Sequence, residues 1–384
     1  MRPLRLLALA ALLVAGHLGW NVHRALALRE ESGVLMPAAG GALEQLELQF
    51  SGLGAERFLE VYAQLVPALD PGTEVVVTVE GPADEARFAA AFRGWFPRGA
   101  ARPALRFVHT GRPITSWARD RLAVIGGSGG EPLTLLAPPA PMVGPAQRVH
   151  DWVVPWTLAD RLPGPPRIRA AAFRFEGGDL IADASHVFVA TPLFERNPGL
   201  AREGKLLARV EAATGLRALR VDAPGAPSPD HHIGMFVTPL GEGRVAVADP
   251  LLGLELLEAA GLLRDDLRLE IGGHLLTLDV SAERLARFAT VARRLEEEGL
   301  EVIPLPALPT TSRYVIASWN NALMERRGGR LQIYLPTYGL PALDDHAAAV
   351  LEAAGARVHP IRVDRLFRLG GSVRCLTAPL RRGA

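Results

Sequence analysis

The stretch VARRLEEEGLEVIPL, residues 291–305, contains the structural unit on which the predicted fold of this chain rests. Its apolar residues recur at the spacing of a helix, and a short run of β-forming residues follows the internal glycine. Gly299 is predicted to end the helix in the left-handed conformation, which glycine adopts without steric cost. The stretch therefore predicts a helix, a glycine cap and a strand.

The same order of elements recurs along the chain. Close copies are LLARVEAATGLRALRV (206–221, with Gly215) and AVLEAAGARVHPI (349–361, with Gly355), and looser copies are 58–80 and 86–110. Hairpin patterns, two apolar runs around a Gly- or Asp-rich turn, lie at 122–136, 180–190, 235–249 and 322–336. Copies spaced by roughly 50–85 residues predict one domain of repeated ββαβ-like units. An ordinary α/β protein, in which helices and strands also alternate, is the alternative.

Composition argues against several classes of function. The 384 residues are 49% hydrophobic and 22% charged, enough to form a sizeable core. The 42 basic and 41 acidic residues give a net charge of +1, which argues against a nucleic-acid groove or an acidic lipid surface as partner. Lys205 is the only lysine, so Schiff-base chemistry has almost no candidate.

The N-terminus, MRPLRLLALAALLVAGHLGW, has the order of a secretory signal. Arg2 and Arg5 precede an apolar run, and Ala25-Leu26-Ala27 offers a small-x-small cleavage site. We therefore expect residues 1–27 to be a signal peptide or N-terminal membrane anchor, and residues 28–384 to be exported, periplasmic or secreted. A buried N-terminal helix is the alternative.

Five polar motifs lie where the predicted strands end, close to the hairpins. They are SWARD (116–120), FEGGD (175–179), DHHIGMF (230–236), SWNNAL (318–323) and GGSVRC (370–375). If the repeated units are arranged around an axis, these stretches converge on one centre. That centre would hold acids, a histidine and a thiol.

Cys375 is the only cysteine, so the chain has no intrachain disulfide. A nucleophilic thiol needs a neighbouring base or cation and room for the substrate. Arg374 is an adjacent cation that would stabilise the thiolate, and Gly370 and Gly371 predict close approach of a substrate. A structural cysteine that only fills apolar space is the alternative.

His231 and His232 precede an apolar stretch. Adjacent residues of a strand face opposite sides, so we expect one histidine to point inward and the other outward, an arrangement that disfavours joint chelation of a metal. A partner for the thiol, a metal pair and a surface pair remain open, and we predict no metal site elsewhere.

Asp120 and Glu176 lie in apolar surroundings, which suits binding of a cationic substrate group. Surface pairing of Asp120 with Arg119 or Arg121, and hydrogen bonding of Glu176 to the glycine backbone, are the alternatives.

The order W-x-R-D, E-G-G, H-φ-x-x-F, S-φ-N and G-G-x-φ-x-C resembles the guanidine-modifying, or pentein, superfamily. Agmatine deiminases and peptidylarginine deiminase-like proteins look most similar, over about residues 70–380. The resemblance implies an α/β class fold, a five-bladed propeller of ββαβ units around a central site. It also implies that no cofactor is needed.

By this resemblance Cys375 is the nucleophile, His232 the general acid and base, and Glu176 the acid that orients the substrate and the histidine. Asp120 would bind the guanidinium, and further substrate contacts are expected from Trp117, Arg119, Asp179 and Gly371. The implied reaction is hydrolysis of, or amidino transfer from, a small-molecule guanidine or peptidyl arginine through a covalent amidino-thioether. Nucleic acid is not an expected partner; a homodimer remains open.

Two residues depart from the superfamily pattern. Gly234 stands where an aspartate usually clamps the guanidinium, and Asp179 or Asp230 would have to replace it. Arg374 stands where a histidine is common; it favours a thiolate but repels a guanidinium. The alternative function is a pentein-fold binding protein that lacks this carboxylate.

Overall fold

The protein is represented by a computed structural model that describes residues 33–52, 54–126, 133–139, 146–200, 202–312 and 314–383. Residues from Val34 onward form one compact unit. The predicted signal peptide or anchor, residues 1–27, lies outside the described residues. None of the helices in the described ranges is both long enough and apolar enough to cross a membrane.

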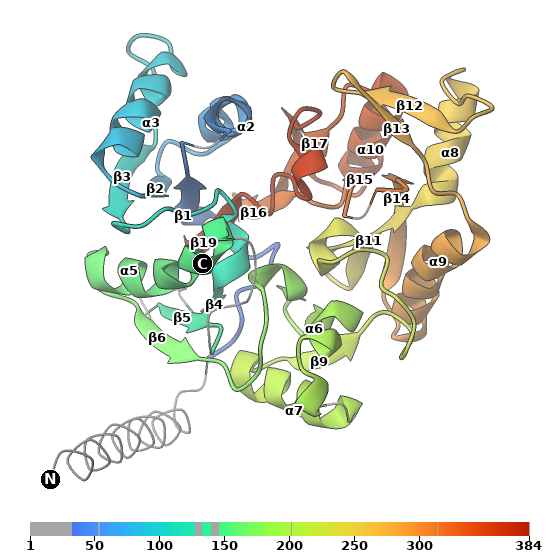
Figure 1. Cartoon of the computed structure of the whole chain (residues 1–384), viewed down its shortest axis with the longest axis horizontal. Coiled ribbons are helices and arrows are strands. Elements are labelled where there is room, and N and C mark those ends of the chain that lie inside the picture. Colours follow the sequence, from blue (N-terminus) through green and yellow to red (C-terminus); the bar gives the residue numbers. More distant parts are fainter. Residues whose placement is uncertain are drawn as a thin grey trace, which may run out of the picture. The chain divides into compact units, whose positions relative to one another are not determined.

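Five sheets of this unit share one connection pattern (Figure 1). In each sheet, two strands form an antiparallel pair. The chain then passes through at least one helix, and the next strand pairs with the second strand and runs parallel to it. The sheets are β19 (Thr377–Arg382) with β1 (Leu43–Phe50), β2 (Glu74–Val79) and β3 (Ala104–His109); β4 (Ala123–Ile125) with β5 (Thr134–Ala137) and β6 (Arg167–Ala170); β7 (Ile181–Ala182) with β8 (His186–Val189) and β9 (Arg217–Arg220); β10 (Val237–Gly241) with β11 (Arg244–Asp249), β14 (Glu301–Pro309) and β15 (Ile316–Ser318); and β16 (Leu323–Arg327) with β17 (Arg330–Thr337) and β18 (Arg357–Arg362).

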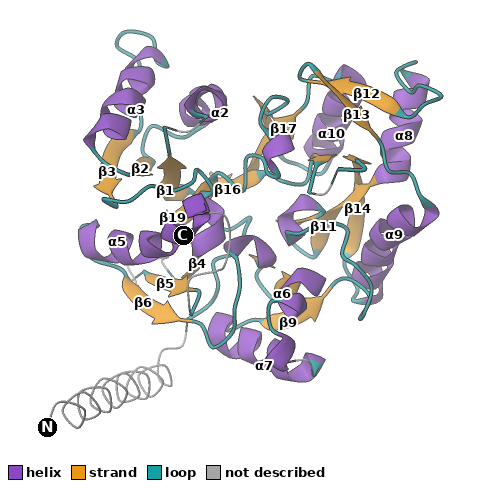
Figure 2. Cartoon of the chain, in the orientation of Figure 1, coloured by secondary structure: helices purple, strands orange, loops and turns teal. Residues whose placement is uncertain are grey.

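The helices connect the strands within each unit (Figure 2). They are α2 (Ala55–Ala68), α3 (Pro82–Gly94), α4 (Ala146–Val149), α5 (Val154–Arg161), α6 (Thr191–Glu195), α7 (Glu203–Thr214), α8 (Pro250–Ala259), α9 (Ala282–Glu297) and α10 (Pro341–Ala353). A further hairpin, β12 (Arg268–Ile271) with β13 (His274–Thr277), lies between α8 and α9 and was not predicted. Buried apolar side chains of the sheets and helices form the core.

The ring of sheets closes through strands from opposite ends of the described chain. β1 pairs in parallel with β2, with Leu46 opposite Val75, and antiparallel with β19, with Leu48 opposite Thr377. Figure 1 shows the five sheets following one another in chain order around the centre of the unit. These are the ββαβ units that the repeat predicted, in the propeller arrangement that the resemblance implied.

The local predictions that produced the repeat are also confirmed. Gly215, Gly299 and Gly355 have φ angles of 67°, 81° and 89° at the ends of α7, α9 and α10. The four predicted hairpins are β4–β5, β7–β8, β10–β11 and β16–β17, although the turn residues 127–132 of the first lie outside the described residues.

Short 3₁₀ turns carry most of the polar motifs to the centre. These turns are η1 (Ala118–Arg121), η2 (His150–Val153), η3 (Gly177–Asp179), η4 (Pro198–Leu200), η5 (Ile233–Met235) and η6 (Phe367–Leu369). η1, η3 and η5 each come directly before the hairpin of a unit, and η3 lies against both η1 and η5. The predicted convergence of the motifs is therefore confirmed.

Candidate active site

Four predicted site residues meet at the centre of the fold. Each of the four comes from a different ββαβ unit. Asp120 lies in η1, Glu176 and His232 each directly precede a 3₁₀ turn, and Cys375 precedes β19. All four are at most 6% exposed. We call Asp120, Glu176 and Asp179 the carboxylate cluster.

The FEGGD motif forms a turn that holds Glu176 against His232. The Glu176 backbone N–H donates to Asp179 Oδ2 at 2.7 Å, and Glu176 Oε2 lies 3.0 Å from His232 Nε2. Gly178 is needed because a Cβ there would lie 2.5 Å from His232 Nδ1, far inside contact distance. Asp179 thus fixes the backbone position of Glu176 by accepting the hydrogen bond from its N–H.

Electrostatics favour a charged pair between Glu176 and His232. Burial opposes charge on the imidazole, but Asp120, the neighbouring Cys375 and Glu176 together raise the pKa of His232 well above its usual range. Burial likewise opposes charge on Glu176, yet its hydrogen bond to His232 and the charges of His232, Arg196 and Arg148 lower its pKa. The geometry therefore supports an imidazolium beside a carboxylate.

Two buried polar atoms in this centre have no hydrogen-bond partner among the described residues. Asp120 Oδ1 and His232 Nδ1 are 3.9 Å apart, and neither has a hydrogen-bond partner within the described part of the chain. Buried polar atoms in native proteins are nearly always paired with protein, water or ligand. A ligand could therefore bind here, with an N–H group that donates to Asp120 Oδ1 and another group that accepts a proton from His232 Nδ1.

The thiol segment is held by hydrogen bonds to Asn321 and Arg119. The Cys375 N–H donates to Asn321 Oδ1 at 3.3 Å, and the Cys375 carbonyl accepts from the Arg119 N–H at 3.1 Å. Ser372 Oγ also donates to Asn321 Oδ1, at 3.0 Å. Asn321 was not predicted as a site residue; its position in SWNNAL was the only signal.

Gly371 lies between the Trp117 ring and the Cys375 side chain and close to both. A Cβ at Gly371 would be 3.1 Å from Cys375 Sγ and 2.7 Å from Trp117 Cζ3. The space freed by this glycine is therefore taken by two side chains of the protein. The roles of Trp117, Arg119 and Gly371 in substrate binding stay predictions.

Arginines of the chain itself already engage the carboxylate cluster. Arg148 Nη2 contacts Asp120 Oδ2 and lies 3.3 Å from Glu176 Oε1. Arg196 Nη2 is 2.7 Å from Glu176 Oε2, and its Nε is 2.8 Å from Asp179 Oδ2. Sequence reasoning missed both, since nothing distinguishes them from the chain's many other arginines.

The expectation that His231 and His232 point in opposite directions is wrong. Their ring centroids are 4.3 Å apart, and the His231 ring also lies against Tyr314. Alternation requires extended strand, whereas these residues form a bend that leads into η5. His231 pairs with Asp230.

The two departures from the superfamily pattern lie against each other. A Cβ on Gly234 would be 2.8 Å from Arg374 Cδ, so the stem of Arg374 covers the position where a carboxylate is usual. Arg374 is 7% exposed, and burial lowers its pKa well below its usual value.

Three of these groups have the spacing of metal ligands. Ligand atoms of Asp120, Glu176 and His232 lie within 4.8 Å of one another. A metal requires neutral imidazole, whereas the His232 pKa is raised, and both acids contact guanidinium groups. The donor set therefore fits a cationic organic group better than a metal ion, and the expected absence of a metal stays a prediction.

Five ββαβ units around a centre with two acids, a histidine and a cysteine define a protein of the pentein fold. Residues 52–380 match the family model of the Porphyromonas-type peptidyl-arginine deiminases. The chain therefore belongs to this deiminase family, whose members are enzymes that act on the C–N bonds of guanidino groups and other linear amidines.

Solved structures support the same fold. The chain is similar to an agmatine deiminase of C. jejuni with substrate bound, at 15% identity and a TM-score of 0.67, covering 91% of this chain and 96% of that one. It is also similar to a Porphyromonas gingivalis protein described as an arginine deiminase (18%, 0.63, 90% and 98%) and to the agmatine deiminase of Enterococcus faecalis (14%, 0.63, 91% and 96%). A comparison with curated protein sequences finds no match.

Proposed function

We propose that this deiminase-family enzyme hydrolyses a guanidino group through a covalent intermediate on Cys375. The observation that carries the proposal is the unpartnered pair formed by Asp120 Oδ1 and His232 Nδ1, buried beside the thiol. An N–H of a guanidinium would satisfy Asp120 Oδ1, and the departing nitrogen would lie within reach of His232.

The proposed reaction has two stages. The Cys375 thiolate attacks the central guanidino carbon, and the departing ammonia or amine takes a proton from His232 as its C–N bond breaks. The product is an amidino-thioether. His232 then takes a proton from water, which adds to the same carbon and releases the thiolate; an acceptor amine in place of water gives amidino transfer. Glu176 holds the imidazole through both stages.

The arginines in the cluster limit how a substrate binds. Among the described residues, Arg148 contacts one oxygen of Asp120 and leaves the other without a hydrogen bond, and both oxygens of Glu176 lie near arginine nitrogens. A substrate guanidinium would therefore bind Asp120 through one oxygen, unless Arg148 moves away. Single contacts are weaker and less directional than bidentate ones, so we expect modest affinity for simple guanidines.

The family supports a small-molecule guanidine or a peptidyl arginine as substrate. We further propose, from the N-terminal sequence alone, that the enzyme acts after export.

The decisive experiment is reaction of the purified protein with a haloacetamidine, a guanidine mimic that alkylates such thiols, followed by intact-mass analysis. We expect one adduct on the wild type and none on Cys375→Ser. Release of ammonia or a urea-type product from a panel of guanidines, agmatine and arginine peptides included, then identifies the substrate. A wild type that forms no adduct and turns over no guanidine would contradict the proposal and favour a binding protein.

A further inference from the structure

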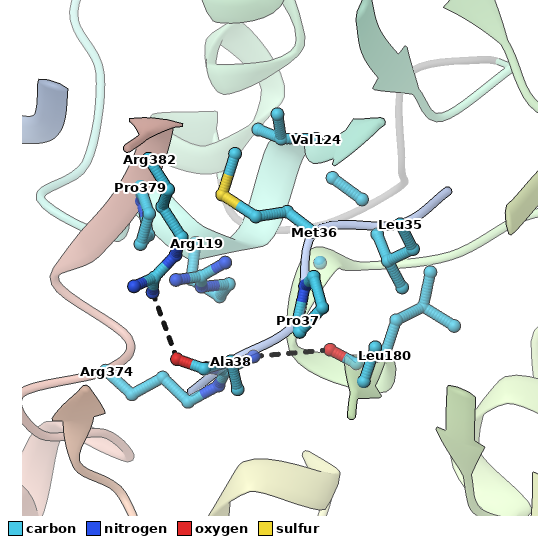
Figure 3. A pocket seen from close by; sticks show the side chains of 13 residues that line it. Leu35, Met36, Pro37, Ala38, Arg119, Val124, Leu180, Arg374, Pro379 and Arg382 are labelled. Atoms are coloured by element: carbon cyan, nitrogen blue, oxygen red, sulfur yellow. Dashed lines mark hydrogen bonds between the residues drawn. The ribbon is translucent and has the colours of Figure 1, made fainter. Parts of the chain in front are cut away.

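A second polar feature lies beside the thiol segment and has no role in the proposed reaction. It is a cavity of about 30 Å³, crossed by the segment Leu35–Ala38. Three guanidinium-bearing side chains line it, from Arg119, Arg374 and Arg382 (Figure 3). No acidic residue is among the described residues that line it. We call this feature the arginine cavity.

The hydrogen bonding of these arginines is incomplete. Arg119 Nε and Nη2 are buried and have no hydrogen-bond partner in the described ranges. Within the described part of the chain, the Arg374 side chain donates a single long hydrogen bond, 3.5 Å to the Leu180 carbonyl. Arg382 is better satisfied, with bonds of 2.8 Å to the Met324 carbonyl and 2.9 Å to the Gly40 carbonyl, but its Nε is unpartnered.

The positive charge of the cavity is also uncompensated. Across the described residues, none of the three guanidiniums is within 4.0 Å of a carboxylate. Burial lowers the pKa of Arg119 to about 10 and that of Arg382 to about 9, so both keep their charge at neutral pH. A cluster of buried like charges is costly unless a counter-charge accompanies it.

The surrounding acids do not supply that counter-charge. Glu47, Asp120 and Glu325 act on these arginines only from beyond ion-pair distance, whereas a Cys375 thiolate would attract both Arg119 and Arg374. Asp120 already contacts Arg148, and Glu325 contacts Arg327. Burial raises the pKa of Glu47 to about 8, which leaves it mostly neutral at pH 7.

We propose that the arginine cavity binds one small monovalent anion of the size of chloride. Arg119 would hold it through its unpartnered Nε and Nη2 groups and Arg374 through its guanidinium, with Arg382 adding charge. The cavity volume is about 30 Å³, roughly twice the ~10–15 Å³ that one ordered water needs. That space suits a single-atom anion and is too small for a tetrahedral oxyanion with its hydrogen bonds. This inference does not depend on the proposed function.

Anion binding would reach the thiol through the shared backbone. The Arg119 N–H donates to the Cys375 carbonyl, and Arg374 is the preceding residue. Both cations attract a thiolate, and a bound anion offsets that attraction. Chloride should therefore slow alkylation of Cys375 at fixed pH and ionic strength.

Diffraction from wild-type crystals soaked in bromide tests the site directly, because bromine gives an anomalous signal and water does not. We expect an anomalous peak within hydrogen-bond distance of Arg119 and Arg374. Density without an anomalous signal would mean that the cavity holds water, and an empty cavity would equally overturn the proposal.

Thermal unfolding tests the site in solution. Replacing gluconate by chloride at about 0.2 M should raise the wild-type midpoint by roughly 2 °C or more, because a ligand of the folded state stabilises it. Arg374→Met should lose this rise, Arg374→Lys should keep part of it, and Arg368→Met, at an exposed arginine nearby, should keep all of it. An equal rise in all variants would contradict the site. If Arg374→Met does not fold, the bromide result and Arg374→Lys decide.

Discussion

The carboxylate cluster and the arginine cavity are built from neighbouring residues yet have opposite electrostatic character. Asp120 and Glu176 belong to the cluster, while the adjacent Arg119 and Gly177 line the cavity. In the cluster every carboxylate contacts a guanidinium of the chain itself. In the cavity the guanidiniums have no carboxylate within ion-pair distance in the described structure.

This difference separates charges that the fold has compensated from charges that it has left for a ligand. Removing a member of the cluster should leave a buried ion without its partner, which is strongly destabilising. Stability near the arginine cavity should instead depend on pH and on the anions in solution. The positive charge there would be balanced by an anion from solution or by a group that titrates.

The largest effect is expected from Glu176→Gln, which leaves Arg148, Arg196 and His232 without their shared carboxylate. We expect a loss of about 3–5 kcal/mol in the free energy of unfolding and at least ~100-fold slower labelling of Cys375 by a haloacetamidine. Urea unfolding and labelling kinetics measure both. Glu195→Gln, at an exposed position of α6, is the control; equal stability of the two variants would show that the cluster is not self-compensated.

The next largest effect concerns pH near the cavity. Burial raises the pKa of Glu47 to about 8 in the folded protein, against about 4.3 in an unfolded chain. The folded state thus binds the proton more tightly, and the free energy of unfolding should fall as pH rises between these values, by at most ~1.4 kcal/mol per pH unit.

Glu47→Gln should remove this dependence, so its stability relative to wild type should increase from pH 5 to pH 8. Urea unfolding at four pH values, with chloride held constant, measures the difference. Glu44→Gln, on the same strand but exposed, should follow the wild type. Parallel curves for wild type and Glu47→Gln would place the pH-sensitive group elsewhere.

The smallest effect is expected from Arg148→Gln, since its side chain is 29% exposed. Removing this guanidinium frees Asp120 Oδ2 for a ligand, so labelling by haloacetamidine should become about two- to fivefold faster, the size of one partly exposed contact. Arg161→Gln, at an exposed arginine at the end of α5, should label at the wild-type rate. Slower labelling would mean that Arg148 positions Asp120 and does not compete with the ligand.

The repeat and the position of the site could be predicted from the sequence because both depend on local patterns. Glycine caps at 215, 299 and 355 and the hairpin turns are short-range signals, and the motifs at strand ends follow from them. The β12–β13 hairpin was missed because it is an insertion within one unit, which a repeat pattern does not predict.

The partners of the site residues could not be predicted, because they depend on contacts between units. Arg148 and Arg196 contact Glu176 from 28 and 20 residues away. No spacing rule covers such contacts. Opposite directions for His231 and His232 follow only if the strand begins before η5. The chain bends there instead, and the two rings lie close together. The sequence likewise gave no sign that Arg374 covers Gly234.

Closure of the ring by β19 against β1 determines the order in which the protein can be completed during synthesis. β1 leaves the ribosome among the first strands, but its antiparallel neighbour, Thr377–Arg382, is translated last among the described strands. Until then β1 has an unpaired edge, which is open to aggregation. Cys375 lies two residues before β19, so the only thiol of the chain takes its place in the same late step.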